Sequence, residues 1–160
     1  MKLTVKTDVD APVEFVHAYL ADSTTWEHEA IRRGIEVQRP ADMPLTGVGA
    51  GWRIKLRFRG RTRNVLIRID EIVQDEVIGY SFEGQALFGT TQMETKALSP
   101  RRSRLKVSVE AKPKTLAARL FLNTLRLARR KVEERMEKRV DQLGERIEDR
   151  GSQITFSGLG

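Results

Sequence analysis

The sequence predicts an α+β fold in which one antiparallel sheet is followed by a long C-terminal helix. Two observations predict it. Between Trp52 and Pro113, apolar and polar residues alternate with a period close to two, which is typical of strands that have one face in a core. After Pro113 the period becomes helical over residues 114–149. A sheet closed by one long helix favours a cavity more than it indicates a particular reaction.

Length and composition fit one domain, which we expect over residues 1–150, with a loosely held tail at 151–160. The chain has no cysteine and only two histidines, so disulfides, thiolate zinc sites and all-histidine metal sites are excluded, and we expect no metal and no cofactor. It has no long apolar run, and Met1-Lys2 leads straight into a strand, so we expect a cytoplasmic protein. The formal net charge of +7 favours anionic partners.

The first elements are one strand and two short helices. Residues 2–9 alternate as a strand, and Pro12 opens a helix over residues 12–21. Thr24 and Glu27 have capping-box spacing, which predicts the start of a second helix that Gly34 ends. Residues 35–39 are a possible strand, followed by a loop with several prolines and glycines.

The remaining strands form a predicted meander. Its first strand starts at Trp52 and carries Arg53, Lys55, Arg57 and Arg59 on the face opposite its apolar residues. Gly60-Arg61 is the predicted turn. Further strands are predicted at 62–73, 76–83, 86–98 and 103–112, separated by turn residues, which gives about six or seven strands in all.

The last helix changes character along its length. Residues 116–128 are apolar around more than half of the helix, so we expect this half to enter the core. Further on, the apolar residues form a narrow stripe. A helix of about 54 Å exceeds a small sheet, so its end should overhang, bend at Gly144 or find a partner. The stripe therefore packs on its own domain or on a second copy, with a homodimer slightly favoured. The stripe residues are Met136, Val140, Leu143 and Ile147.

The order of these elements resembles the helix-grip fold of the START and birch-pollen-allergen superfamily, in particular the SRPBCC group of polyketide cyclases/dehydrases and lipid-transport proteins. The resemblance covers about residues 1–140. It implies a curved sheet gripping the long helix, an apolar pocket between the two, and no fixed catalytic residue. The chain departs from the common pattern at residues 101–104 and in its long terminal helix. The residues that carry the resemblance are Val9-Asp10-Ala11-Pro12, Val16, Leu20, Asp22, Trp26, Gly47-Val48-Gly49 before Trp52, Ile69-Asp70-Glu71-Ile72 and Tyr80.

The predicted pocket wall consists of the inward residues of the strands and the apolar face of residues 116–128. The alternative is that these side chains pack a solid core. Tyr80 is the polar group best placed to bind a ligand, because a phenol among apolar neighbours needs a hydrogen-bond partner, although that partner can also be internal. The predicted wall comprises Trp52, Ile54, Leu56, Phe58, Ile67, Ile69, Tyr80, Phe82, Met93, Leu105, Val107, Leu120, Phe121 and Leu125.

Catalytic residues are not evident. His17 and His28 are the side chains that titrate near neutrality and, with Tyr80, are weak candidates for acid–base chemistry. His17 lies off the apolar face of its helix, and His28 could form a polar mouth beside Trp26. No carboxylate has a spacing that demands a dyad with either histidine, and the alternative is that both are structural or solvated.

Basic residues form a second candidate surface. Arg53, Lys55, Arg57 and Arg59 share one side of a strand and could meet an anionic membrane or RNA, although no stacking aromatics accompany them and a solvated face is the alternative. In the last helix, Arg119, Arg126 and Arg130 fall on one face opposite the core, with Leu122 close to its edge, and could dock on anionic lipid. The alternative, and the commoner use of such a helix, is to cover the sheet.

The sequence as a whole favours a domain that binds a hydrophobic or amphipathic small molecule or a lipid, for transport, storage or sensing. One alternative is an aromatase/cyclase-type enzyme acting on a polyketide-like substrate. The other is a protein- or ribosome-binding module that uses the basic surface.

Overall fold

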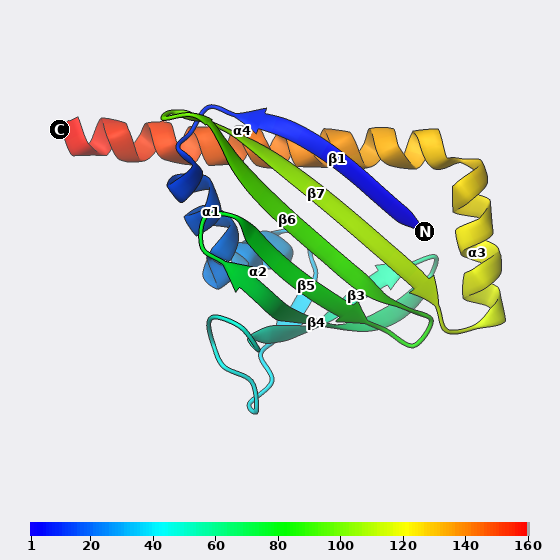
Figure 1. Cartoon of the computed structure of the whole chain (residues 1–160). Helices are drawn as coiled ribbons and strands as arrows, with labels where there is room; N and C mark the ends of the chain where they lie inside the picture. Colours follow the sequence, from blue (N-terminus) through cyan, green and yellow to red (C-terminus); the bar gives the residue numbers. More distant parts are fainter. Residues whose placement is uncertain (160) are drawn as a thin grey trace.

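A computed structural model describes residues 1–159 and confirms the predicted α+β fold. Seven antiparallel strands form one sheet in the order β1-β7-β6-β5-β4-β3-β2, and four helices complete the described part of the chain (Figure 1). The elements are β1 Lys2–Val9, α1 Val13–Ala21, α2 Ser23–Arg32, β2 Glu36–Gln38, β3 Gly51–Phe58, β4 Arg61–Val73, β5 Val77–Glu83, β6 Leu87–Ser99, β7 Arg102–Pro113, α3 Leu116–Leu127 and α4 Arg129–Leu159.

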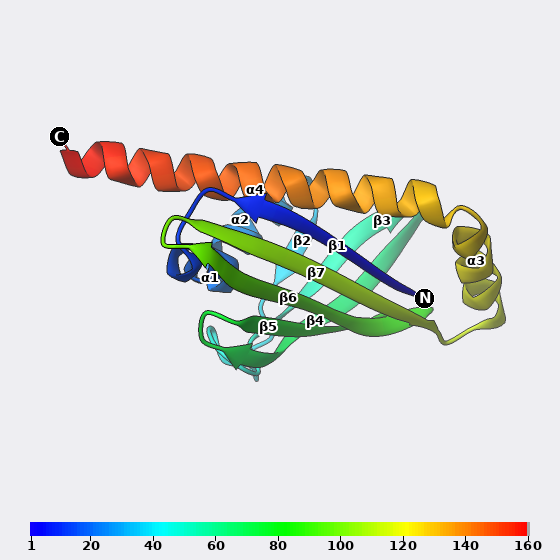
Figure 2. The ribbon, with the colours of Figure 1, turned by 45° about the horizontal axis from the view of Figure 1, so that its top comes forward.

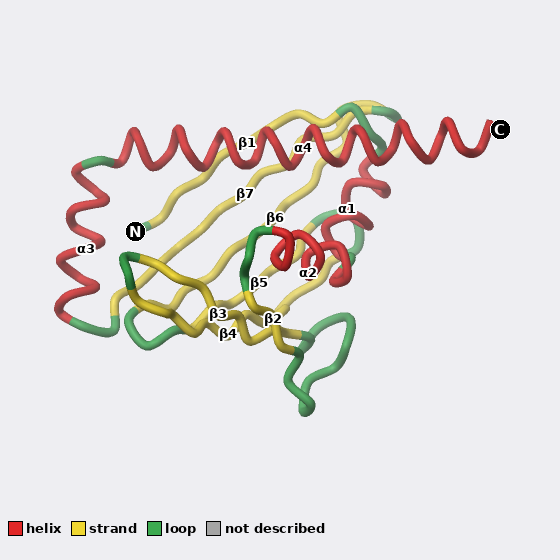
Figure 3. The backbone as a smooth tube through the Cα atoms, turned by 180° about the vertical axis from the view of Figure 1, so that it is seen from behind, coloured by secondary structure: helices red, strands yellow, loops and turns green. Residues whose placement is uncertain are grey.

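The sheet is curved, and its helices lie on the concave face. Figure 2 shows the curvature beneath α4, and the view from behind in Figure 3 shows α1, α2 and α4 in front of the strands. The period-two alternation sets this arrangement, because Val5 and Val9 of β1 pair in register with Val107 and Ser103 of β7, so that these side chains all point to the same face. The helices bury that face.

The short helices start as the sequence indicates, with one correction. Pro12 has an extended backbone and leads into α1, as expected. The predicted capping box of Thr24 and Glu27 is wrong, because Asp22 is the N-cap of α2 and its carboxylate accepts the backbone N–H groups of Thr24 and Thr25 at 3.0 and 3.4 Å. Glu27 is therefore available for contacts outside its own helix.

The first turn of the meander is shifted by one residue from its predicted position. Arg59 and Gly60 are the central residues, with φ values of 53° and 73°. Two successive positive φ values define the type I′ turn, whose twist matches that of the adjoining strands. The positive charge of Arg59 is thus held at the tip of the β3–β4 hairpin.

The predicted single helix over residues 114–149 is two helices that meet at Ala128. Ala128 leaves the helical conformation at φ −103° and ψ 23°, and its N–H is shared among the carbonyl groups that end α3. Arg129 then donates to the carbonyl oxygen of Lys2 at 3.1 Å, which ties the start of α4 to β1. No proline or glycine marks the break, so tertiary contacts impose it.

Residues 116–128 were predicted to enter the core and the later apolar stripe to overhang or find a partner, but the structure shows the reverse. The narrow stripe of α4 enters the core: Val140, Leu143 and Ile147 are 7, 6 and 0 % exposed, and Met136 packs against them. The homodimer predicted through this stripe is therefore wrong, because the stripe is buried in its own domain. The predicted bend at Gly144 is also absent, since α4 is continuous there.

Gly144 allows α4 to lie close to β1. A Cβ atom at this position would be 3.3 Å from the methyl carbons of both Thr7 and Val9, which is tighter than ordinary van der Waals contact. A glycine inside a helix costs about 1 kcal/mol of helix stability relative to alanine. Here the absence of a side chain allows the two elements to pack closely. Beyond this contact α4 continues to Leu159, through the segment for which the sequence predicts a loosely held tail.

Candidate functional site

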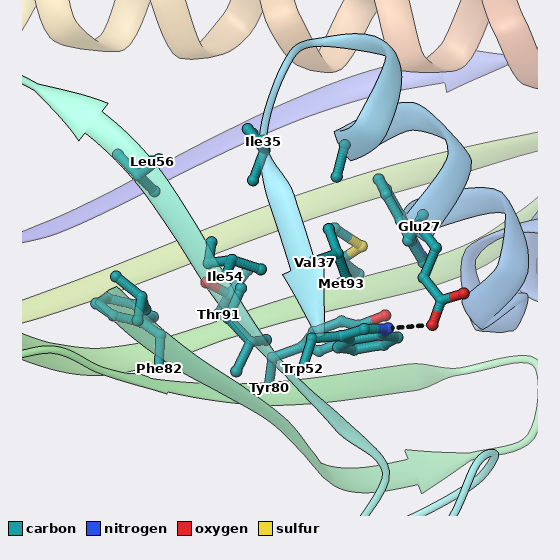
Figure 4. A pocket seen from close by; sticks show the side chains of 14 residues that line it. Glu27, Ile35, Val37, Trp52, Ile54, Leu56, Tyr80, Phe82, Thr91 and Met93 are labelled. Carbon is teal, nitrogen blue, oxygen red and sulfur yellow. Dashed lines mark hydrogen bonds between the residues drawn. The ribbon is translucent and has the colours of Figure 1, made fainter. Parts of the chain in front are cut away.

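A cavity of about 420 Å³ lies on the concave face, between α2 and strands β2 to β6 (Figure 4). Its lining is almost entirely apolar, and many of the strand residues in it are half-buried, so their side chains border open space instead of packing on one another. The lining residues are Trp26, Glu27, Ala30, Ile35, Val37, Trp52, Ile54, Leu56, Val65, Ile67, Tyr80, Phe82, Thr91 and Met93.

One half of the predicted wall lines this cavity, as the strand alternation indicates. In β3 the inward side chains of Trp52, Ile54 and Leu56 line the cavity, and residues of β4 pair with them in register, as Ile67 does with Trp52. Ile67 in turn pairs with Phe82. The structure therefore brings together, from the predicted wall, Trp52, Ile54, Leu56, Ile67, Tyr80, Phe82 and Met93.

The other predicted wall residues lie elsewhere. Ile69, Leu105 and Val107 belong to the solid core, which α1 and α4 cover, and they are 5 % exposed or less. Phe58 packs edge-on against Phe121 at 5.9 Å between ring centroids, outside the cavity. The C-terminal region does not close the cavity, because α3 stands at the end of the sheet. Its residues Leu120, Phe121 and Leu125 are absent from the lining, and Leu120 is 59 % exposed.

The side of the cavity that the sequence did not predict comes from α2 and β2. Trp26 and Glu27 lie about one helical turn before Ala30 on α2, and Val37 of β2 pairs with Ile54 of β3. The spacing of Trp26 and Ala30 was a usable signal, because residues four apart share a helix face. Nothing in the sequence showed which way this face points.

Glu27 is the charged residue in the lining, and its charge is balanced inside the protein. Its Oε1 accepts the indole N–H of Trp52 at 2.9 Å (Figure 4). The same oxygen accepts the Nε–H of Arg39. Arg39 also lies over the Trp52 ring, 4.9 Å from the centroid, and donates to the carbonyl oxygen of Leu45 at 2.7 Å. This Glu27–Arg39–Trp52 cluster joins α2, the loop after β2 and β3 at one end of the cavity.

Tyr80 has an internal partner. Its hydroxyl donates to the carbonyl oxygen of Leu20 at 3.3 Å, and the indole N–H of Trp26 donates to the same oxygen at 2.7 Å. Burial raises the pKa of Tyr80 to about 12, against an ordinary value of 10.0, so its phenol is neutral at physiological pH. A neutral phenol whose hydrogen is already donated can still accept a hydrogen bond from a ligand.

The raised pKa of Tyr80 predicts a loss of stability at alkaline pH. Above pH 10 the unfolded chain loses this proton while the folded protein keeps it until about pH 12, so the free energy of unfolding falls between these two values. We expect the urea midpoint to fall more steeply over this range in the natural protein than in Tyr80→Phe. Equal slopes for the two proteins would contradict a buried, neutral Tyr80.

The histidines are not brought together with Tyr80. His17 was predicted off the apolar face of α1 but is 2 % exposed, and its Nδ1 has no hydrogen-bond partner. His28 is exposed and lines a second, polar cavity of about 460 Å³ between α2 and α4, which also contains Glu29 and Arg146. Tyr80 lines the apolar cavity, so the three weak catalytic candidates form no common site.

The described residues lack two features that would indicate other functions. No three histidine, cysteine, aspartate or glutamate side chains gather as a metal site would require. No described helix combines the length and the apolar character needed to cross a bilayer.

The predicted basic face of β3 points away from the cavity. Arg53, Lys55 and Arg57 are exposed on the opposite side of the strand from Trp52. On neighbouring strands, Asp70 pairs with Arg68 at 2.9 Å and Glu83 pairs with Lys114 at 2.6 Å. These carboxylates are therefore engaged with other cations.

A curved antiparallel sheet whose concave face holds a long helix and an apolar cavity defines a helix-grip domain. The chain belongs to the family described as polyketide cyclase/dehydrase and lipid transport, whose model matches residues 1–148. This confirms the resemblance noted from the sequence. A search of curated proteins found no match.

Solved structures show the same fold at low sequence identity. An aromatase/cyclase from Streptomyces is 17 % identical with a TM-score of 0.62, and the match covers 91 % of this chain and 94 % of that one. A protein from Thermus thermophilus is 17 % identical with a TM-score of 0.61, over 92 and 97 % of the two chains. A START superfamily protein from Mycobacterium smegmatis is 16 % identical with a TM-score of 0.51, over 86 and 97 %.

Proposed function

We propose that this protein binds a hydrophobic or amphipathic small molecule or lipid in the cavity between α2 and the sheet, for transport, storage or sensing. The observation that carries the proposal is a cavity of about 420 Å³ with almost no polar lining, which is the size and character of small-molecule sites. An apolar ligand that loses about 300 Å² of exposed surface gains roughly 7 kcal/mol before association costs.

Binding is favoured over turnover by the state of the polar groups around the cavity. Glu27 is held by Trp52 and Arg39, and the Tyr80 hydroxyl donates to a backbone carbonyl. Neither group is poised as a general base, which needs a free proton acceptor within reach of the substrate. An aromatase/cyclase activity on a polyketide-like substrate is the alternative, and product formation on incubation with such a substrate would support it.

The cavity hypothesis predicts that a larger side chain inside the cavity weakens binding. Trp26 and Trp52 are the two tryptophans of the chain and both line the cavity, so energy transfer to the neutral apolar probe N-phenyl-1-naphthylamine reports binding there. Because Ala30 lines the cavity, Ala30→Phe should weaken the probe affinity about tenfold or more by occupying its space. Ala18→Phe places the same side chain on the exposed side of α1 and should leave the affinity unchanged.

Equal probe affinity in the natural protein and Ala30→Phe would overturn the assignment of the cavity. Native mass spectrometry of protein purified from its own host, followed by lipid extraction, then identifies the ligand. A co-purifying apolar compound supports the carrier role. A protein that carries no compound and binds no probe points to a protein- or ribosome-binding module.

A further inference from the structure

Two basic stretches that are far apart in the sequence meet at one end of the molecule. Seven basic residues and no acidic one lie between Arg53 and Arg68, and six basic residues and no acidic one lie between Lys114 and Lys131. The β3–β4 hairpin contacts α3 through the ring contact of Phe58 with Phe121, and the Arg59 guanidinium lies 4.4 Å from the centroid of the Phe121 ring. The fold therefore brings the hairpin end of the first stretch beside the second stretch on α3.

The outer face of α3 is apolar and uncovered. Leu116, Leu120 and Leu127 are 72, 59 and 92 % exposed, and their spacing places them on one side of the helix. Arg119 and Arg126 flank this side, and both are exposed. The buried face of α3 is formed by Ala118 and Leu122, at 6 and 4 % exposure, so Leu122, predicted at the edge of the basic face, is buried and not available for docking.

Many cations at this end have no acidic partner. Lys114 pairs with Glu83, and Arg129 and Arg130 pair with glutamates one turn along α4. Within the described part of the chain no carboxylate lies within 4.0 Å of the remaining arginines, and the buried Nε of Arg63 has no partner. These arginines are Arg57, Arg59, Arg61, Arg63, Arg119 and Arg126.

We propose that α3 and the β3–β4 hairpin form a docking surface for an anionic lipid bilayer. The leucines of α3 would enter the boundary between head groups and acyl chains, while the arginines beside them meet lipid phosphates. An exposed apolar helix face flanked by basic residues is the pattern that binds anionic membranes, through apolar burial plus electrostatic attraction.

Other occupants fit this surface less well. RNA would engage the arginines but would leave three exposed leucines in water, and the Phe121 ring is covered by Arg59 and unavailable for stacking on a base. A second copy packed through the same surface would bring Arg119 and Arg126 against like charges. A bilayer satisfies the apolar and the cationic groups together.

The docking surface lies beside one end of the apolar cavity. Leu56, which lines the cavity, pairs in register with Arg63, and the next pair along the hairpin on the same face is Phe58 with Arg61. Membrane docking would therefore bring this end of the cavity close to lipid. The inference goes beyond the proposed binding function, because docking requires only the surface and is testable with an empty cavity.

The experiment is co-flotation of the full chain with vesicles of phosphatidylcholine alone, or of phosphatidylcholine containing about one-third phosphatidylglycerol, at roughly 0.05 and 0.3 M salt. We expect binding to the anionic vesicles only, weakened by salt. Arg119→Glu with Arg126→Glu should reduce the affinity roughly thirtyfold or more, since each lost basic residue contributes about fivefold. Lys96→Glu with Arg101→Glu is the matched control and makes the same charge change at exposed positions of β6 and the β6–β7 turn.

A second variant separates a membrane from other anions. Leu120→Ser with Leu127→Ser changes two exposed side chains, so the fold should survive, and vesicle affinity should fall about tenfold while the charge is unchanged. Equal losses in the α3 charge variant and the Lys96/Arg101 control would overturn the proposal, because nonspecific net charge would then explain binding. Unchanged vesicle affinity in the leucine variant, with tighter binding to single-stranded RNA, would assign the surface to RNA instead.

Discussion

A chain that ends at Arg135 should fail to fold. It lacks Val140, Leu143 and Ile147, which α4 inserts between β1 and α1 in the centre of the core. Burying three such side chains stabilises the protein by roughly 5 to 9 kcal/mol, which is comparable to the whole stability of a domain of this size, about 5 to 15 kcal/mol. We expect no cooperative urea transition and no near-ultraviolet circular dichroism signal.

Two controls separate the core role of α4 from a general effect of shortening. A chain ending at Gln153 keeps the three buried residues and should unfold cooperatively. In the full chain, Leu143→Ala should cost about 2 to 5 kcal/mol, since it leaves a cavity in a packed core. A folded, monomeric chain ending at Arg135 in sedimentation experiments would contradict the packing described for α4.

Breaking the Glu27–Arg39–Trp52 cluster should have the largest effect of any single charged substitution near the cavity. The side chains of Glu27 and Arg39 are each 23 % exposed, so Glu27→Ala leaves a largely buried guanidinium and the indole N–H of Trp52 without their shared acceptor. We expect a loss of roughly 2 to 4 kcal/mol in the free energy of unfolding, measured by urea titration. Tryptophan emission should shift as well, because Trp52 loses its hydrogen bond.

A double-mutant cycle isolates the ion pair from the packing around it. Glu27→Ala with Arg39→Ala should cost less than the sum of the two single changes, by roughly 1 to 2 kcal/mol, because no charge is left uncompensated. Glu94→Ala is the matched control, since Glu94 pairs with Lys106 at an exposed site and its loss should cost less than about 1 kcal/mol. Additive costs for Glu27 and Arg39 would show that the pair contributes nothing to stability.

Local pattern predicted most of the strands and the short helices because each signal is contained within the element. The alternation that starts at Trp52 indicates strands with one face buried in a core. In the structure, strands β3 to β7 begin and end within one residue of their predicted positions. Pro12 marked the start of the first helix for the same local reason. The cap of α2 was misassigned because Asp22 and Thr24 offer competing acceptors, and only the backbone geometry chooses between them.

The cavity was predicted on the strand side and missed on the helix side. The alternation fixes that Trp52, Ile54 and Leu56 share a face, whichever element covers them. Which element covers them depends on contacts between residues far apart in the chain. The sequence pointed to residues 116–128, whereas Trp26 and Glu27 of α2 line the cavity, and Glu27 accepts the indole N–H of Trp52 from β3.

The sequence alone thus determined the fold class, the order of its elements and the inward face of each strand, because these follow from periodicity and backbone preference. Only the tertiary structure decided which half of the C-terminal region the sheet grips. The width of the apolar face of a helix indicates how much of the helix can be buried, but it does not specify which element the helix packs against. The sheet accepts the narrow stripe of α4 because Gly144 permits contact with Thr7 and Val9, and it leaves the leucines of α3 exposed at its end.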